Sequence, residues 1–146
     1  MYKSGLFDEK TFYQAFVADL EASKSEVIIE SPFITSERMK MVYPSLVRLI
    51  NRGVRVYVVT RDPSEHINGY EEQSEKEIQA LEALGVQVLI CVGNHHRKLA
   101  IIDREILWEG SLNILSQMKS REFMRRLEGG GFAGDLFQFI GYEKYI

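Results

Sequence analysis

Helical and strand patterns alternate three times within the first 91 residues of the chain. Apolar side chains at helical spacing predict three helices, over residues 8–22, 36–51 and 70–84. Short apolar runs rich in β-branched residues predict three strands, over residues 26–34, 54–60 and 86–91. Asp8 and Ser36 are the expected N-caps of the first two helices. Because parallel strands need a crossover, usually a helix, the alternation predicts an α/β protein with a largely parallel sheet flanked by helices.

The alternation of predicted helices and strands ends at residue 91. Two apolar stretches, residues 97–103 and 105–110, are separated by a single residue and predict a hairpin, which makes the expected sheet mixed. The next segments predict a short helix, a strand and a closing helix rich in aromatic residues, over residues 112–120, 122–127 and 135–146. With 146 residues, 45% of them hydrophobic, the chain is long enough for one domain spanning residues 1–146.

Positive charge is concentrated in residues 92–126, although the whole chain has a net charge of −3. This segment holds seven Lys and Arg against four Asp and Glu, whereas residues 1–91 hold ten against fourteen. A locally basic groove can exist on an acidic protein, and phosphate groups respond to the local field. The charge therefore permits a nucleic-acid partner; the alternative is a solvated basic face.

No stretch of the sequence is typical of a membrane span or an export signal. The apolar runs are much shorter than the roughly 20 residues that cross a bilayer, and no basic and apolar signal-peptide pattern opens the chain. Cys91, the single cysteine, cannot form an internal disulfide, and its place at the end of an apolar run predicts a buried, inert thiol. We expect a cytoplasmic protein with no membrane partner.

The residues best suited to catalysis lie within residues 96–113. His96 supplies an imidazole, Lys98 an ammonium and Asp103 a carboxylate. Gly110 allows a close approach of the backbone, Ser111 supplies a hydroxyl and Asn113 an amide. Side chains two positions apart on a strand face the same side, so His96 and Lys98 are expected to project together. The hairpin then returns Ser111 and Asn113 to the same end.

This predicted convergence suits the chemistry of a phosphodiester. Lys98, Ser111 and Asn113 can bind the non-bridging oxygens of the substrate and stabilise charge in the transition state. His96 is able to attack phosphorus near neutral pH. Gly110 allows a close approach of the backbone.

The spacing of these residues resembles the HxK(x)4D(x)6GSxN signature of the phospholipase D superfamily, with every fixed position filled. The resemblance implies a phospholipase D-like fold and a two-step reaction. One histidine attacks phosphorus to form a phosphohistidine, a second protonates the leaving oxygen, and water resolves the intermediate without a metal or other cofactor. Asp103 matches the acidic residue of the family, and its place at the far end of the strand predicts a structural and electrostatic role.

The reaction implied by the resemblance needs two histidines, but the chain carries one signature. His95 adjoins His96 and is expected to point to the opposite face, and His66 has no lysine two residues on. Superfamily members of this length pair two identical chains so that both signatures meet in one site. The resemblance therefore implies a homodimer.

Residues after the signature are further candidates for the site. Glu122 opens a predicted strand, where it either orients the catalytic imidazole, as a glutamate does in small nucleases of the superfamily, or forms an exposed ion pair with Arg121 or Arg125. Arg125 and Arg126 face opposite ways on a strand, so at most one contacts a nucleic-acid backbone, and Arg125 is the candidate. The aromatic residues, including Phe33 and Trp108, are expected in the core or a dimer interface more often than stacked on bases.

Three functions fit the sequence. The one we expect is a nuclease that cuts DNA or RNA. A second is a phospholipid hydrolase or phosphatidyltransferase, but those enzymes typically carry two signatures, and no amphipathic membrane-binding helix is visible. A third is a nucleic-acid-binding module, which would have little need for both His96 and Lys98. The modest positive charge suggests that a fused or associated helicase-like or restriction component delivers the substrate.

Overall fold

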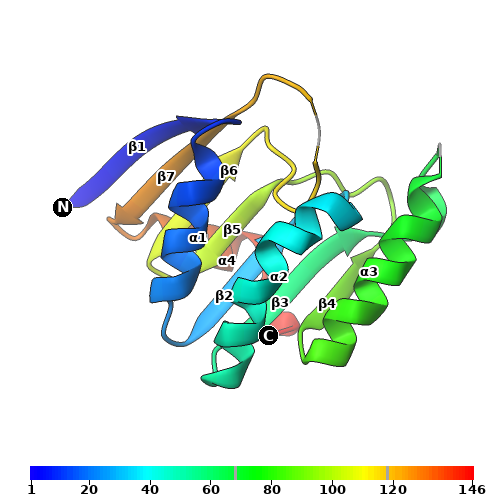
Figure 1. Cartoon of the computed structure of the whole chain (residues 1–146). Helices are drawn as coiled ribbons and strands as arrows, with labels where there is room; N and C mark the ends of the chain where they lie inside the picture. The colour runs from blue at the N-terminus through cyan, green and yellow to red at the C-terminus, as the bar shows by residue number, and fades with distance from the viewer. Residues whose placement is uncertain (68, 118) are drawn as a thin grey trace.

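The computed structural model describes residues 1–67, 69–117 and 119–146 (Figure 1). The strands are β1 (Tyr2–Asp8), β2 (Glu26–Glu30), β3 (Arg55–Arg61), β4 (Gln87–Cys91), β5 (Leu99–Ile102), β6 (Ile106–Gly110) and β7 (Phe123–Gly129). The helices are α1 (Phe12–Ala22), α2 (Ser36–Asn51), α3 (Tyr70–Leu84) and α4 (Phe132–Ile140), with short 3-10 helices η1 (Pro63–Glu65) and η2 (Tyr142–Lys144). Within these ranges seven strands form a single sheet in the order β1-β7-β6-β5-β2-β3-β4. The predicted α/β class, a mixed sheet flanked by helices, is confirmed, but the expectation that the sheet is largely parallel is wrong, because four of its six ladders are antiparallel.

The parallel part of the sheet is formed by β2, β3 and β4, whose connections are the predicted helical crossovers. The remaining ladders are antiparallel, from β2 through β5, β6 and β7 to β1. The predicted hairpin is formed by β5 and β6, and its turn places Asp103 and Arg104 at φ values of 54°. Two successive residues with positive φ give a turn whose twist matches that of the strands.

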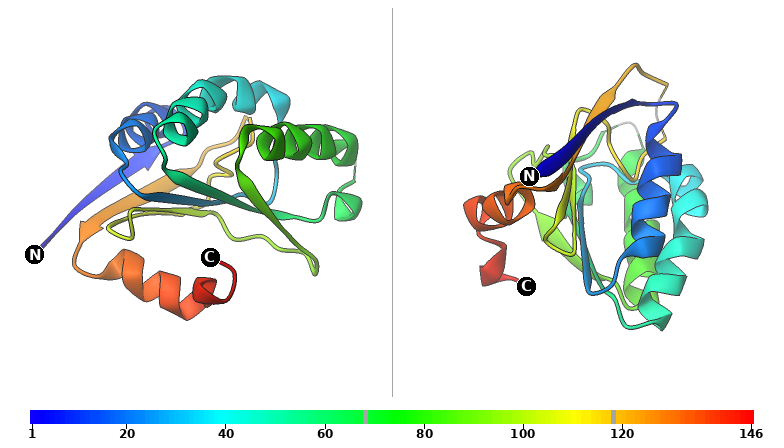
Figure 2. Two further views of the ribbon diagram at one scale, coloured as in Figure 1. Left: turned by 90° about the horizontal axis from the view of Figure 1, so that it is seen from below. Right: turned by 90° about the vertical axis from the view of Figure 1, so that its left-hand side faces the viewer.

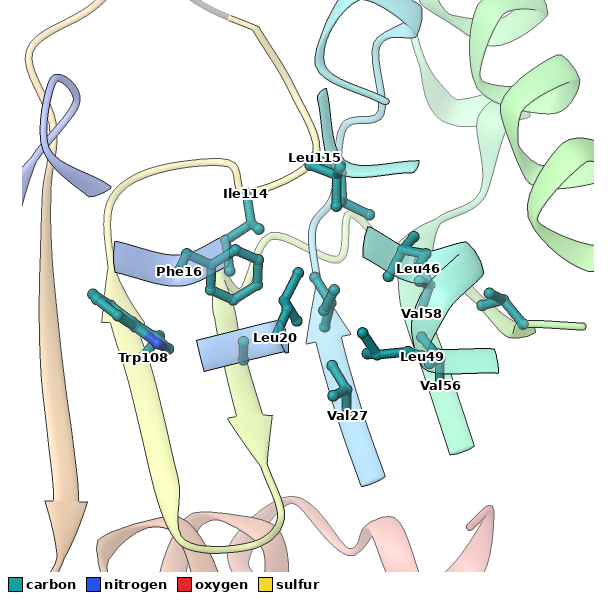
Figure 3. Packing of buried hydrophobic residues seen from close by; sticks show 14 of the residues in the cluster. Phe16, Leu20, Val27, Leu46, Leu49, Val56, Val58, Trp108, Ile114 and Leu115 are labelled. Carbon is teal, nitrogen blue, oxygen red and sulfur yellow. The ribbon is translucent and has the colours of Figure 1, made fainter. Parts of the chain in front are cut away.

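Helices cover both faces of the sheet, with α1, α2 and α3 on one face and α4 and η2 on the other (Figure 2). The larger core lies between the sheet and α1 to α3 and includes Phe16, Leu46 and Leu115 (Figure 3). Trp108 is fully buried there, and its indole N–H donates to the Asp19 carboxylate at 2.8 Å. Trp108 is therefore a core residue, as expected.

Two features at the start of the chain differ from the sequence prediction. Strand β1 was not expected, because it lies at the edge of the sheet and its side chains are at most half-buried. Helix α1 begins at Phe12 and not at residue 8. The Asp8 carboxylate instead accepts hydrogen bonds from the backbone N–H groups of Lys10 and Thr11, at 2.9 and 3.0 Å, which forms a turn between β1 and α1.

The predicted N-cap of the second helix is also displaced by one residue. Thr35 is the N-cap of α2, and its hydroxyl accepts a hydrogen bond from the Arg38 N–H at 3.4 Å. Ser36 is the first helical residue, and its hydroxyl donates to the Glu77 carboxylate at 3.0 Å. Either hydroxyl can cap a helix, so the sequence alone does not distinguish them.

The helix predicted over residues 112–120 is wrong for the residues that the structure describes there. The backbone N–H of Leu115 donates to the Ser31 hydroxyl at 3.0 Å, and that of Gln117 donates to the Thr35 hydroxyl at 2.8 Å. Ile114 and Leu115 are fully buried. Tertiary hydrogen bonds therefore satisfy the backbone that a helix would have satisfied internally.

The end of the chain is helical, but over a shorter range than predicted. Helix α4 begins at Phe132 and ends before Gly141, which adopts a φ of 84° that favours glycine. The 3-10 helix η2 follows and buries Tyr142 in the second, smaller core with Ile28 and Phe137. Cys91 lies at the rim of this core and is half-buried, not buried as predicted.

Candidate active site

The candidate site is an open pocket of about 850 Å³ at the end of β5, β6 and β7. Six of the residues proposed from the sequence line it, namely His96, Lys98, Ser111, Asn113, Glu122 and Arg125. We call this hollow the signature pocket. The fold therefore brings together side chains that are up to 29 positions apart in the chain.

His96 and Lys98 lie in an extended segment just before β5. The prediction placed them on a strand, but β5 begins only at Leu99. The Lys98 ammonium lies 2.9 Å from Nδ1 of His96 and donates to the His96 carbonyl at 2.8 Å. The two side chains are therefore neighbours on one side of the segment, as predicted.

The surroundings of His96 favour its neutral form. Burial lowers the pKa of the His96 imidazole below its usual value, and the positive charges of Lys98 and Arg61 lower it further. Burial also lowers the pKa of Lys98, while the charge of Glu122 opposes that shift. A neutral imidazole retains the lone pair that a nucleophile needs.

Ser111 and Asn113 follow β6 directly. The Ser111 N–H donates to the Phe123 carbonyl at 3.0 Å, and the Ser111 hydroxyl accepts from the Phe123 N–H at 3.1 Å. The hydroxyl of Tyr13 donates to the Asn113 carbonyl at 3.3 Å and also to the carbonyl of Ile114. Strand β7 and helix α1 thus hold the backbone from which the hydroxyl and amide reach the pocket.

Gly110 allows β6 and β7 to approach closely, as expected from its place in the signature. A Cβ atom at this position would lie 2.2 Å from the Phe123 carbonyl oxygen and 2.9 Å from Cα of Met124. Both are backbone atoms of β7, so no side-chain rotation can relieve the contact.

Glu122 lines the signature pocket beside Ser111 and Lys98. Hydrogen bonds from Ser120 and Ser111 lower the pKa of the Glu122 carboxyl, and the Lys98 charge adds to this effect. The carboxylate is therefore ionised near neutral pH and forms part of the polar wall of the pocket.

Arg125 and Arg126 point to opposite faces of β7, as predicted. Arg125 lines the signature pocket. Arg126 is on the face covered by α1, where its guanidinium binds Asp19 at 2.7 Å and Glu128 at 2.9 Å. Arg125 therefore remains the candidate for contact with substrate.

Asp103 lies at the opposite end of β5 from the signature pocket. Its carboxylate accepts hydrogen bonds from the backbone N–H groups of Lys24, Ser25 and Glu26, at 2.9, 2.8 and 3.0 Å. Although burial opposes it, this set of donors lowers the pKa of Asp103. The position fits the predicted structural role, since Asp103 joins the hairpin to the start of β2.

The two other histidines bind elsewhere. Nε2 of His95 lies 2.7 Å from the Glu30 carboxylate, on the side of the segment away from His96. His66 is buried and stacks on Phe33 with ring centroids 5.0 Å apart. Glu30 was not among the residues proposed from the sequence, although a carboxylate that directly follows the apolar run 27–29 is the kind of signal that marks a buried polar contact.

The described residues form neither a metal-binding cluster nor a membrane span. Across residues 1–67, 69–117 and 119–146, no three His, Cys, Asp or Glu side chains are grouped so that they fit a metal ion. None of the helices in those ranges combines the length and the apolar character that a membrane span requires.

Solved structures with the same fold come from several bacteria. NucT from Helicobacter pylori is 19% identical with a TM-score of 0.71, covering 99% of this chain and 95% of that one. Nuc from Salmonella typhimurium, a phospholipase D family member, is 17% identical with a TM-score of 0.72, and the match covers 95% of this chain and 91% of that one. Phosphatidylserine synthase from Haemophilus influenzae is 12% identical with a TM-score of 0.68, and its match covers 99% of this chain but 38% of the synthase.

Sequence comparison identifies the family directly. No curated protein matches the chain. The family described as "Cardiolipin synthase, PLD-like domain" matches residues 16–124, which is more than half of the sequence and includes the whole signature. The signature, the mixed sheet and this match agree, and the chain belongs to the phospholipase D superfamily.

Proposed function

We propose that the protein is a metal-independent endonuclease that cleaves DNA or RNA through a phosphohistidine in a homodimeric active site. The observation that carries the proposal is the meeting of His96, Lys98, Ser111 and Asn113 in one open pocket. An imidazole held neutral beside an ammonium, a hydroxyl and an amide suits attack on a phosphodiester.

The proposed reaction has two steps. In the first, a ring nitrogen of His96 bonds to phosphorus, and the bond from phosphorus to the leaving oxygen breaks as a second imidazole protonates that oxygen. In the second, this imidazole removes a proton from water, whose oxygen displaces His96 from phosphorus. Lys98, Ser111 and Asn113 bind the non-bridging oxygens in both steps.

The second imidazole is supplied by a second copy of the chain in this proposal. His95 is bound to Glu30 and His66 is buried against Phe33, so neither is placed to protonate a leaving group in the signature pocket. A two-fold interface would bring a second His96 opposite the first. Glu122 lines the same pocket, and in this proposal its carboxylate orients an imidazole.

Nucleic acid is the favoured substrate for two reasons. Arg125 lines the signature pocket along with Lys98, and cations of this kind contact a phosphate backbone. The chain also has nearly the full length of the Nuc and NucT structures, and the short, single-signature members that its sequence resembles include nucleases. The alternative, a phospholipid hydrolase or phosphatidyltransferase, draws support from the fold shared with phosphatidylserine synthase.

The test is cleavage of single- and double-stranded DNA and RNA in excess EDTA. We expect the wild-type protein to cut at least one of them and His96→Ala to cut none. Lys76→Ala, which removes an exposed lysine on α3, is the control and should cut like wild type. Release of a phospholipid headgroup without cleavage of any nucleic acid would replace the nuclease with the lipid alternative.

A further inference from the structure

The segment that carries His96 is not held by the sheet. Residues 94–98 have no regular secondary structure, and the ladder between β5 and β2 begins with the pair Leu99 and Glu30. A segment without ladder hydrogen bonds is free to rotate or slip, and a slip by one residue moves each side chain to the other face. Other contacts must therefore keep His96 directed into the signature pocket.

The Glu30 carboxylate supplies these contacts. Glu30 is fully buried at the end of β2, and one of its oxygens accepts from His95 Nε2 at 2.7 Å and from Arg97 Nε at 3.1 Å. The other oxygen accepts from Arg97 Nη2 at 3.4 Å and from the Tyr142 hydroxyl. Burial alone would raise the pKa of Glu30, but the hydrogen bonds from His95 and Tyr142 and the charge of Arg97 outweigh burial and lower it. The carboxylate therefore stays ionised and binds all its donors strongly.

Because successive side chains point to opposite sides of the segment, the contacts of Glu30 with His95 and Arg97 also fix the direction of His96. His95 and Arg97 both reach Glu30, so the residues between and after them, His96 and Lys98, are directed to the other side. A second anchor lies just upstream, where the Glu65 carboxylate accepts from the backbone N–H groups of Gly93 and Asn94 at 2.8 and 3.2 Å. Residues 94–98, the nucleophile segment, are thus held by two carboxylates, that of Glu65 at the start of the segment and that of Glu30 within it.

We infer that Glu30, with its partners His95 and Tyr142, is a positioning centre that fixes the direction of the His96 imidazole in the signature pocket. The inference rests on the proposed function for its catalytic consequence. None of the three residues contacts the substrate in this scheme, and they act only through the backbone of residues 95–97. Loss of the cluster should therefore lower kcat with little change in KM.

The same strand offers a matched control. Glu26 begins β2 as Glu30 ends it, is likewise buried, and binds two arginines, Arg104 at 3.0 Å and Arg55 at 3.5 Å. It lies at the end of the sheet away from the signature pocket. Replacing Glu26 therefore disrupts a buried carboxylate of the same kind without touching the His96 segment.

The experiment compares His95→Leu, His95→Gln and Glu26→Gln with wild type, using bis(4-nitrophenyl) phosphate as a small phosphodiester. Since misplacement of about 1 Å can cost about 100-fold in rate, we expect His95→Leu to lower kcat about tenfold while KM changes less than about twofold. His95→Gln keeps an N–H donor for Glu30 and should retain kcat within about twofold. Glu26→Gln should lower thermal stability and leave kcat unchanged below its melting temperature.

A second measurement does not depend on activity. The {1H}–15N NOE of the His96 amide should equal that of the β5 amides in wild type, His95→Gln and Glu26→Gln, and should fall in His95→Leu. If wild type hydrolyses no phosphodiester, the proposed function fails, while this NOE still tests the positioning. Unchanged kcat and NOE in folded His95→Leu, or equal losses of kcat in His95→Leu and Glu26→Gln, would overturn the inference.

Discussion

The two ends of β5 use carboxylates for opposite purposes. At the Asp103 end, the carboxylate accepts three backbone N–H groups and closes the hairpin onto β2. At the His96 end, the Glu30 carboxylate holds the neighbours of His96 and leaves His96 itself in an open pocket. One signature therefore spans a structural end and an end that carries the proposed nucleophile, and the two are separated by a four-residue strand. Substitutions at the two ends should separate stability from catalysis.

The largest effect on catalysis among substitutions that keep His96 is expected for Lys98→Ala. Removing one group that stabilises charge in the transition state typically lowers kcat by about 10²- to 10³-fold. Stability should change little, because the ammonium bonds mainly within its own segment, to the imidazole and carbonyl of His96. Steady-state kinetics and thermal unfolding measure the two quantities. A loss of stability that matches the loss of rate would contradict the separation of the two ends.

Gly110→Ala should affect both stability and catalysis. The added Cβ would lie 2.2 Å from the Phe123 carbonyl oxygen, so β6 and β7 must move apart. We expect the free energy of unfolding to fall by about 3 kcal/mol, as for severe overpacking, and kcat to fall because Ser111 follows directly. Urea unfolding and kinetics check this. Glu109→Ala, which shortens a half-buried side chain on the same strand, should retain stability within about 1 kcal/mol.

Asp103→Asn should destabilise the protein without affecting kcat. The asparagine keeps one acceptor oxygen and tolerates the positive φ at this position, so we expect a loss of about 1 kcal/mol. The pKa of Asp103 is lower in the folded protein than its ordinary value of 3.8. The carboxylate therefore contributes its full share of stability above pH 3.8, and this share is lost as the pH falls through the folded pKa. The difference between variant and wild type in urea unfolding should therefore shrink at acid pH. A variant that is stable but inactive would place Asp103 in the chemistry.

The smallest expected effect is on the pH profile. His96 must be neutral to attack, and its pKa is lowered from 6.5, so kcat/KM should fall as pH drops through a midpoint below 6.5. Arg61→Gln removes one of the charges that lower this pKa and should move the midpoint upward by less than about one pH unit. If the midpoint moved downward instead, the fall of kcat/KM at low pH would come from the titration of a group other than His96.

The sequence predicts those parts of the molecule whose structure is determined by residues close together in the chain. The crossover helices, the hairpin and the pocket residues from His96 to Asn113 follow from periodicity and spacing within short segments. The segment after Asn113 could not be predicted, because its backbone is bonded by Ser31 and Thr35, about 80 positions away. Strand β1 depends on pairing with β7 at the other end of the chain.

The contacts that orient the site residues also join parts of the chain that are far apart in the sequence. The sequence places His95 opposite His96, but the partner of His95 is 65 positions earlier, in a strand whose apolar run conceals it. Spacing can therefore identify the groups of the proposed reaction, whereas the contacts that orient them become visible only in the assembled sheet.

The contact between Tyr142 and Glu30 joins residues 112 positions apart. A growing chain emerges in sequence order, so every residue of the signature leaves the ribosome before Tyr142 does. In the proposed scheme a partly made chain then carries the whole signature while its nucleophile segment still lacks one of the contacts that orient it. Full activity would consequently appear only after the chain has been made through Tyr142, although the signature is complete at Asn113.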